Sequence, residues 1–343
     1  MINDDFTQVL LEQIGSDVNM HNVYLQHGLS GYCAFYFWLS QKAKDESYET
    51  LAKQMLLRVT NSIKQLPAVD IENGITGIGL IVLWLNNKGF LTGNGHSFFE
   101  TIEAYLYKTT NLGIDTNSEV IELHNLLDVL IFLAERLELE SIEESYKQFL
   151  KLWSVKIIAY IHQRVSTILS DEPLLSDAHY DLAIFLYVLF KLHKLGVYTY
   201  YLERIFNEIR MSVTTRIPYL QLNRAYLYYT LCLIGKEFSL GNEWVTYMQW
   251  LKSSFSINAI IENEIRGNQL FGQLGLIRLH FALKYYIKNG IEIEIPYDLI
   301  LKKIKSSSYY KNRTKVAEVP KGLDGILGLY LLYTNIVEHG TKD

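Results

Sequence analysis

Apolar side chains gather along the chain in nearly continuous runs of about three to four helical turns, separated by segments of mixed charge. Because a helix that is apolar on every side is buried, each run predicts a buried helix. The segments between the runs carry apolar residues at three- and four-residue spacing, which is typical of surface helices. The four clearest runs each follow a pair of small residues: GLSGYCAFYFWL (28–39), GITGIGLIVLWL (74–85), GQLGLIRLHFAL (272–283) and GLDGILGLYLLY (322–333).

The spacing of these runs indicates an internal repeat. Between the second and the third run there is room for three weaker copies, which we place at 125–137, 178–190 and 222–233. The seven copies then recur at steps of about 44 to 53 residues. The buried helices are predicted to start near residues 29, 75, 125, 178, 222, 272 and 323. Amphipathic helices are predicted at 5–14, 47–66, 97–110, 141–165, 200–217, 242–255 and 296–307.

This alternation predicts one all-α domain over residues 1–343, an (α/α) toroid of about seven helical hairpins with the apolar helices inside. An open α-solenoid of the same hairpins is the alternative. We favour the closed ring, because inner helices this apolar need neighbours on every side, including at both ends of the chain.

Composition narrows the class of protein. The 343 residues are 49% hydrophobic, which is ample for a large core. Two distant cysteines, Cys33 and Cys232, favour a reducing compartment, and the acidic first stretch does not resemble a signal peptide. A net charge of −5 without a basic run argues against nucleic acid, and the apolar runs are too short for a membrane span. We therefore expect a cytoplasmic protein without a cofactor.

The Gly-x-x-Gly segments GLSG, GITG, GQLG and GLDG, in a seven-fold register from about Asp4 to Val337, resemble the lanthionine synthetase C-like (LanC-like) family. The resemblance implies a double-layered α/α barrel and a role in peptide modification. In peptide-modifying members, two cysteines and one histidine hold a zinc ion that activates a Cys thiolate for thioether formation, and a further histidine serves in acid/base steps.

The register places apolar residues where the resemblance implies zinc ligands. The first Cys position falls near Leu220, and the Cys-His pair falls on Leu270 and Phe271. Asp177 stands where the acid/base histidine is implied. Because aliphatic and phenyl groups offer no lone pair to zinc, we expect a LanC-like protein without the zinc site, and thioether cyclisation that depends on zinc is not expected.

Polar residues that introduce the inner helices are expected to converge at one mouth of the ring. The densest group, SDAHYD at 176–181, contains Asp177, His179 and Asp181. These residues could cap a helix, with Ser176 or Asp177 accepting backbone N–H bonds. Alternatively, Asp181 or His179 is a general acid or base, or binds a cationic group. A metal site of His179, Asp177 and His124 is a further alternative, although no zinc spacing supports it.

Three other segments supply candidates. His124 and Asp128 are four residues apart, so they could bond to each other or join the 176–181 group. Arg224, beside Asn223, could clamp a carboxylate or phosphate, or pair with Asp181. Asp324 is interpreted as a carboxylate at a helix N-terminus. The catalytic candidates are Asp181, His179, Asp177 and His124, and the substrate-binding candidates are Arg224, Asn223, Asp128 and Asp324.

Other notable residues have structural interpretations. His280 is expected to be a hydrogen-bonded core histidine, and both cysteines are expected to be small buried hydrophobes. The 25 tyrosines suit a groove for an extended peptide or a sugar, although helix packing explains most of them.

Three functional hypotheses follow from these observations. The first is a LanC-like protein without zinc in ribosomal peptide natural-product maturation, which binds a precursor peptide or a partner modifying enzyme at the toroid mouth. The second is a metal-independent enzyme of cyclase, lyase or hydrolase type that uses the mouth carboxylates and histidines. The third is a structural or regulatory scaffold.

Overall fold

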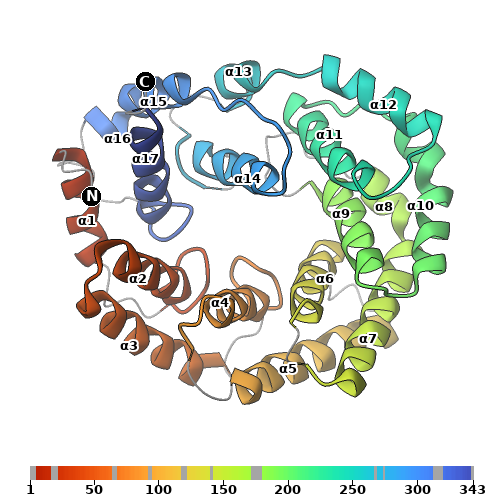
Figure 1. Ribbon diagram of the computed structural model, residues 1–343, viewed down its shortest axis with the longest axis horizontal. Coiled ribbons are helices and arrows are strands. Elements are labelled where there is room, and N and C mark those ends of the chain that lie inside the picture. The colour runs from red at the N-terminus through yellow and green to blue at the C-terminus, as the bar shows by residue number, and fades with distance from the viewer. Residues whose placement is uncertain are drawn as a thin grey trace. The chain divides into compact units, whose positions relative to one another are not determined.

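The computed structural model describes residues 5–16, 22–63, 68–91, 95–116, 122–139, 142–170, 180–265, 269–272, 275–311 and 320–340. These residues form helices and no strand. Seven of the helices coincide with the predicted apolar runs: α2 Leu29–Ala43, α4 Ile75–Asn87, α6 Leu123–Leu137, α9 Asp181–Lys194, α11 Gln221–Gly235, α14 Leu276–Lys288 and α17 Ile326–Gly340. Figure 1 labels them.

Seven longer amphipathic helices alternate with these apolar helices, as the sequence pattern predicts. They are α1 Asp5–Ser16, α3 Glu46–Ser62, α5 Gly95–Asp115, α7 Glu144–His162, α10 Thr199–Thr214, α12 Asn242–Ser253 and α15 Tyr297–Ser306. Short helices fill some connections: α8 Val165–Ser170, α13 Ile257–Ala259, the π-helix Ile260–Glu264 and α16 Ser308–Lys311. The all-α fold of helical hairpins is therefore confirmed.

The described chain divides into two compact units. Unit 1 contains residues 1–106, 265–281 and 296–343, and unit 2 contains residues 107–264 and 282–295. The division falls inside α5 and α14.

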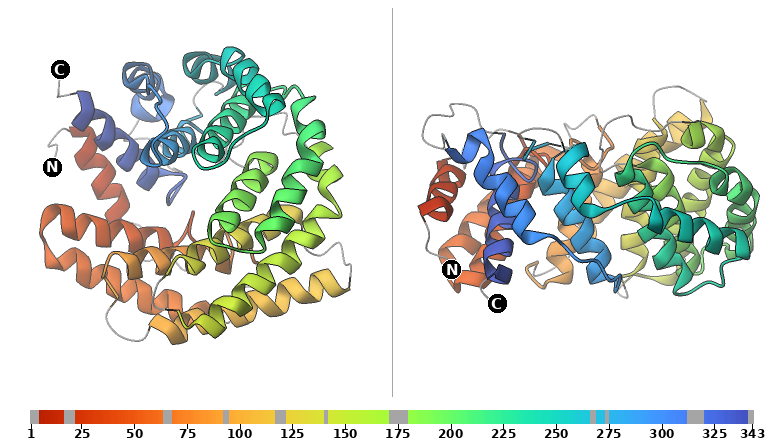
Figure 2. Two further views of the ribbon diagram at one scale, coloured as in Figure 1. Left: turned by 45° about the vertical axis from the view of Figure 1, so that its right-hand side comes forward. Right: turned by 90° about the horizontal axis from the view of Figure 1, so that it is seen from above.

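Unit 1 brings together both ends of the chain, with α1 packed against α17 (Figure 2). The ring centroid of Phe6 lies 4.6 Å from that of Tyr310 and 4.8 Å from that of Tyr333. Lys42 at the end of α2 forms an ion pair with Glu338 of α17. In an open solenoid the first and last repeats contact only their sequence neighbours, whereas in unit 1 the first and last helices contact each other.

In unit 2 successive hairpins pack side by side. Helix α6 packs against α7 and α9, α9 packs against α10 and α11, and α11 packs against α12. The Nε1–H of Trp153 in α7 donates to Thr110 Oγ1 in α5 at 3.1 Å, so a buried polar contact joins these two amphipathic helices. The apolar helices contribute most of the core: Leu126, Phe132, Phe185, Leu227 and Leu231 are each fully buried.

The Gly-x-x-Gly segments introduce their helices in two different ways. In the first two copies the second glycine lies inside the helix, and the first glycine, Gly28 or Gly74, has extended backbone. In the last two copies the helix begins after the second glycine, at Leu276 and Ile326 rather than near 272 and 323. There the first glycine, Gly272 or Gly322, has φ of +80° or +75°. Because L side chains avoid this left-handed region, glycine is required at both positions.

Close backbone contact explains the second glycine of each copy. A Cβ on Gly31 would lie 2.3 Å from the carbonyl oxygen of Leu25, and a Cβ on Gly77 would lie 1.9 Å from that of Ile71. The loop before the helix therefore folds back onto its first turn. In the first copy this return is held by the Leu29 N–H, which donates to the Asn22 carbonyl at 2.8 Å.

Candidate functional site

His124, Asp181 and Asp128 form a polar cluster at the start of two neighbouring apolar helices of unit 2. His124 lies in the first turn of α6, and Asp181 is the first residue of α9. The Nδ1 atom of His124 is 2.9 Å from Asp181 Oδ1, and its Nε2 atom is 3.8 Å from Asp128 Oδ2. Asp128 is fully buried, whereas the side chains of His124 and Asp181 are 27% and 19% exposed. A histidine between two carboxylates, partly open to solvent, can accept and donate a proton.

Two other candidates of this group, Asp177 and His179, lie outside the described residues. Of the residues predicted to cluster here, the structure describes Asp181, His124 and Asp128. It brings these three together, which is the alternative in which His124 and Asp128 join the 176–181 group. Their catalytic role stays a prediction.

The Arg224 guanidinium is occupied by backbone carbonyls. Its Nε donates to Pro218 O at 2.7 Å, its Nη1 to Ser254 O at 2.9 Å and its Nη2 to Tyr219 O at 3.1 Å. Arg224 thus holds the turn before α11, a contact that neither sequence interpretation includes. The adjacent Asn223 is fully buried. A role of either residue in binding a substrate stays a prediction.

Asp324 lies two residues before the start of α17, where it belongs to a buried charge cluster of unit 1. Arg278 Nε donates to Asp324 Oδ1 at 2.7 Å, and Arg278 Nη2 to Asp324 Oδ2 at 2.5 Å. Glu72 Oε1 is 2.7 Å from the same Nη2, which also donates to Gln26 Oε1. Burial lowers the pKa of Arg278, but Asp324 and then Glu72 outweigh this effect and raise it.

Arg278 is not among the residues singled out from the sequence, because it lies in the middle of an apolar run. The available signal was its charge: an arginine on the buried side of a helix must find carboxylates. His280 on the same helix is 1% exposed, so its predicted place in the core is confirmed.

A pocket of about 240 Å³ lies among α6, α9, α11 and α14 in unit 2, and we call it the tyrosine pocket. Its lining residues are Ile131, Glu135, Tyr180, Ala183, Ile184, Tyr187, Tyr226, Thr230, Ala282, Tyr285 and Tyr286. The hydroxyls of Tyr187 and Tyr285 share a hydrogen bond, and Thr230 Oγ1 lies 3.0 Å from the Tyr286 hydroxyl. Aromatic walls with polar tips bind chains that carry both apolar and amide groups.

Burial and neighbouring charges shift the pKa values of groups in and beside this pocket. Burial raises the pKa of Tyr187 to about 12, so its phenol stays neutral at physiological pH. Lys191, one turn further along α9, forms an ion pair with Glu135 and lies 3.3 Å from Glu138. Burial lowers the pKa of Lys191, but Glu135 outweighs this effect, so the ammonium stays charged. Tyr180 lines the pocket and directly precedes Asp181 in the sequence. The tyrosine pocket and the His124–Asp181 cluster are therefore adjacent along the chain.

The residues at the implied zinc positions offer no ligand. Leu220 and Leu270 are buried, and Phe271 packs edge-on against Tyr309 at 5.4 Å. Burial raises the pKa of Cys33 to about 12, and its thiol donates to the Ala52 carbonyl. Cys232 lies in the middle of α11, and burial raises its pKa as well. The part of the chain that is described contains no group of three His, Cys, Asp or Glu side chains that could hold a metal ion.

The model of the lanthionine synthetase C-like protein family matches residues 19–184. Over these residues the chain is similar to LanC-like proteins. The match covers the first two Gly-x-x-Gly copies and the His124–Asp181 cluster, so this cluster lies within the LanC-like segment. A comparison with curated proteins found no match. None of the helices in the described ranges is long and apolar enough to cross a membrane.

Proposed function

We propose that this LanC-like protein acts in ribosomal peptide natural-product maturation in the cytoplasm, without zinc, by binding a precursor peptide or the enzyme that modifies it. The family match supports a scaffold related to lanthipeptide cyclases. The tyrosine pocket supports the binding role, and it is the observation on which the proposal chiefly rests. Leucine and phenylalanine at the implied ligand positions support a function without the metal.

Three properties of the tyrosine pocket suit a peptide. Its walls are largely apolar, so they can bury side chains. The phenol groups of Tyr187 and Tyr285 remain neutral, because burial raises the pKa of both, and neutral phenols both donate and accept hydrogen bonds. Glu135 lines the pocket and pairs with Lys191 beside it, so its carboxylate can receive cationic or amide groups of the ligand.

The proposal is tested with a fluorescent model peptide that contains one dehydroalanine and one cysteine, with and without added zinc. We expect saturable binding and no loss of the free thiol, because no zinc-activated thiolate forms. The Tyr187→Ala and Tyr285→Ala variants should each weaken binding about ten-fold or more, as expected for central aromatic contacts. Tyr200, which is 80% exposed and does not line the pocket, provides the matched control Tyr200→Ala.

Stoichiometric zinc in the purified protein, together with loss of the peptide thiol, would show that this is a metal-dependent cyclase. Unchanged affinity in both pocket variants would show that the peptide does not bind in the tyrosine pocket.

The His124–Asp181 contact favours a second candidate function, a metal-independent enzyme of cyclase, lyase or hydrolase type. His124 would transfer the proton, and Asp181 would orient its ring. If so, His124→Gln should abolish turnover of a bound peptide while its affinity stays within two-fold, roughly the error of such a comparison. A product formed equally by His124→Gln and by the unchanged protein would rule out this mechanism.

A further inference from the structure

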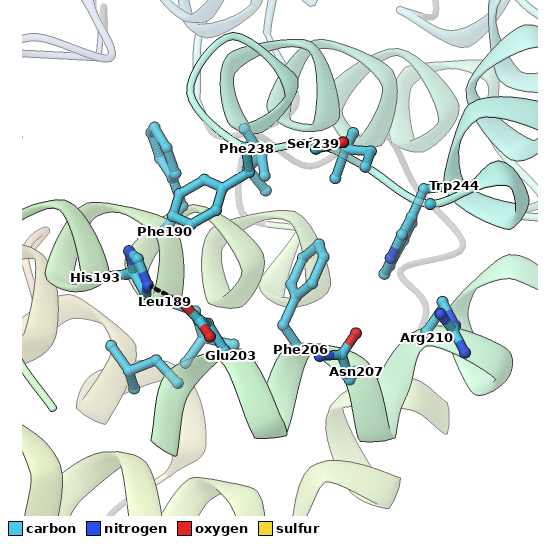
Figure 3. Close-up of a pocket in the computed structure, with 14 residues that line it drawn as sticks. Leu189, Phe190, His193, Glu203, Phe206, Asn207, Arg210, Phe238, Ser239 and Trp244 are labelled. Atoms are coloured by element: carbon cyan, nitrogen blue, oxygen red, sulfur yellow. Dashed lines mark hydrogen bonds and ion pairs between the residues drawn. The ribbon is translucent and has the colours of Figure 1, made fainter. Parts of the chain in front are cut away.

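A second pocket of unit 2 lies among α9, α10, α11 and α12, apart from the tyrosine pocket (Figure 3). Its volume is about 220 Å³. The proposed function makes no use of it. Its lining residues include Phe190, Glu203, Phe206, Arg210, Phe238 and Trp244.

Aromatic rings form much of its wall. Phe206 of α10 stacks on Trp244 of α12, with ring centroids 4.8 Å apart and planes 23° apart. Phe190 of α9 meets Phe238 edge-on at 5.7 Å. Because the two ring pairs come from different helices, an apolar group between them would contact aromatic carbon on two sides.

Two N–H donors of this pocket lack an acceptor. Trp244 is 2% exposed, and within the described ranges neither its Nε1–H nor the Nε–H of Arg210 has a hydrogen-bond partner. Nearly all buried donors in folded proteins are satisfied, since an unpaired one loses its bonds to water without replacement. Two such donors in one pocket therefore indicate that a ligand oxygen belongs there.

Charge is distributed unevenly along the pocket. Arg210 and Trp244 lie at one end in Figure 3, while His193 and Glu203 lie at the other. The Glu203 carboxylate accepts a hydrogen bond from His193 Nε2 at 2.8 Å. Arg210 reaches Glu243 only at 3.9 Å through its Nη1, which leaves its Nε–H available. The end with the two unsatisfied donors thus carries the arginine, with Glu243 as its paired carboxylate.

We propose that this pocket binds a carboxylate attached to an apolar body about the size of one phenyl group. The carboxylate accepts hydrogen bonds from Arg210 Nε–H and Trp244 Nε1–H, and the apolar body lies against Phe190, Phe206 and Phe238. Hydrogen bonds between a guanidinium and a carboxylate are among the strongest in proteins, and burial of the body adds the hydrophobic contribution. The ligand is either a free aryl-alkyl carboxylic acid or the C-terminal carboxylate of an apolar residue in a peptide.

Isothermal titration calorimetry on the full chain distinguishes these two sources. One arm uses 3-phenylpropionate against 3-phenylpropanamide, and the other uses N-acetyl-Gly-Phe with a free or an amidated C-terminus. In at least one arm the carboxylate should bind at least about ten-fold more tightly than its amide, as expected for loss of a charged acceptor. Tighter binding of the free acid would identify a small acid as the ligand, and tighter binding of the dipeptide would identify a peptide terminus.

Variants locate the site. Arg210→Leu should lose at least about ten-fold in affinity for the carboxylate. Trp244→Phe removes the N–H but keeps a ring, and it should lose about three- to ten-fold. Arg204→Leu is the matched control, because Arg204 lies on the same helix, pairs with Glu208 and does not line the pocket. Its affinity should be unchanged.

The proposal is wrong if neither carboxylate binds saturably at millimolar concentration, or if each amide binds as well as its acid. These comparisons use the unchanged protein, so they hold even if a variant fails to fold. Full affinity in folded Arg210→Leu or Trp244→Phe would also overturn the assignment. Because the site shares no lining residue with the tyrosine pocket, its failure leaves the proposed function unaffected.

Discussion

Arg278 in α14 forms a two-bond ion pair with Asp324 in the turn before α17. Both residues are buried, as are their neighbours Glu72 and Gln26. The cluster thus joins the first two repeats to the last two within unit 1. The aromatic contacts between α1 and α17 hold the two ends of the chain together through apolar rings. This cluster does the same through charged side chains.

Removing the arginine should destabilise the protein strongly. In Arg278→Met two buried carboxylates lose their cation, and such losses cost about 3–5 kcal/mol. The urea midpoint should fall accordingly. The control is Arg204→Met, which removes an exposed pair with Glu208 and should cost well under about 1 kcal/mol. Equal midpoints for the two variants would contradict a structural role for the buried cluster.

Gly322 and Gly89 provide a matched pair of glycine substitutions. Both have positive φ, +75° and +72°. A Cβ on Gly322 would lie 1.8 Å from the Gln26 carbonyl oxygen, whereas a Cβ on Gly89 would meet nothing within 4 Å. Gly89→Ala should therefore lower the free energy of unfolding only by the strain of the left-handed backbone, about 1–2 kcal/mol. Gly322→Ala should lower it clearly more, because of the added clash. Thermal unfolding measures both, and similar losses would show that the loop around Gly322 gives way easily.

His124 and Asp181 should be energetically coupled. A double-mutant cycle with His124→Gln and Asp181→Asn should give a coupling of about 0.5–3 kcal/mol in the free energy of unfolding, because the two side chains are in contact and partly buried. The exposed pair Glu49–Lys53 on α3 is the reference, with an expected coupling of about 0.3–0.5 kcal/mol. Additive effects of the His124 and Asp181 substitutions would argue against the contact.

Cys33 should be nearly inert toward iodoacetamide in the folded protein. Its pKa of about 12, against an ordinary value of 9.0, lowers the thiolate population about a thousand-fold, and the thiolate is the reactive form. Cys232 is less buried and should react faster. Mass spectrometry of alkylated peptides measures both rates, and urea should make them equal. Fast labelling of Cys33 in folded protein would mean that α2 and α3 separate readily.

Alkaline pH should destabilise the protein through Tyr309. Burial raises the pKa of this phenol to about 12 from 10.0. Below pH 10 the tyrosine is neutral in both states, so it adds no pH dependence. As pH rises from 10 toward 12, the unfolded state ionises first, and stability is lost. Tyr309→Phe should have a smaller decline in its urea midpoint over this range, and an unchanged decline would assign the effect to other groups.

The positions of the helices could be predicted from the sequence, because apolar periodicity is a local property and each run is long enough to be buried on all sides. All seven apolar helices begin within four residues of the predicted starts. The grouping of His124 with Asp181 could also be anticipated, since both lie at the start of neighbouring repeats. A contact between both ends of the chain was expected because inner helices this apolar need neighbours on every side.

Side-chain pairing across repeats depended on three-dimensional packing. Arg278 finds Asp324 and Glu72 far away in sequence, and Arg224 finds backbone carbonyls instead of a carboxylate. Segments that share the Gly-x-x-Gly pattern adopt different turns: the first glycine has extended backbone in the first two copies and positive φ in the last two. The unsatisfied donors of Trp244 and Arg210 have no signature in the sequence at all. Hydrophobic periodicity specifies which face of a helix is buried, whereas the partners of a polar group depend on which helices are brought against it.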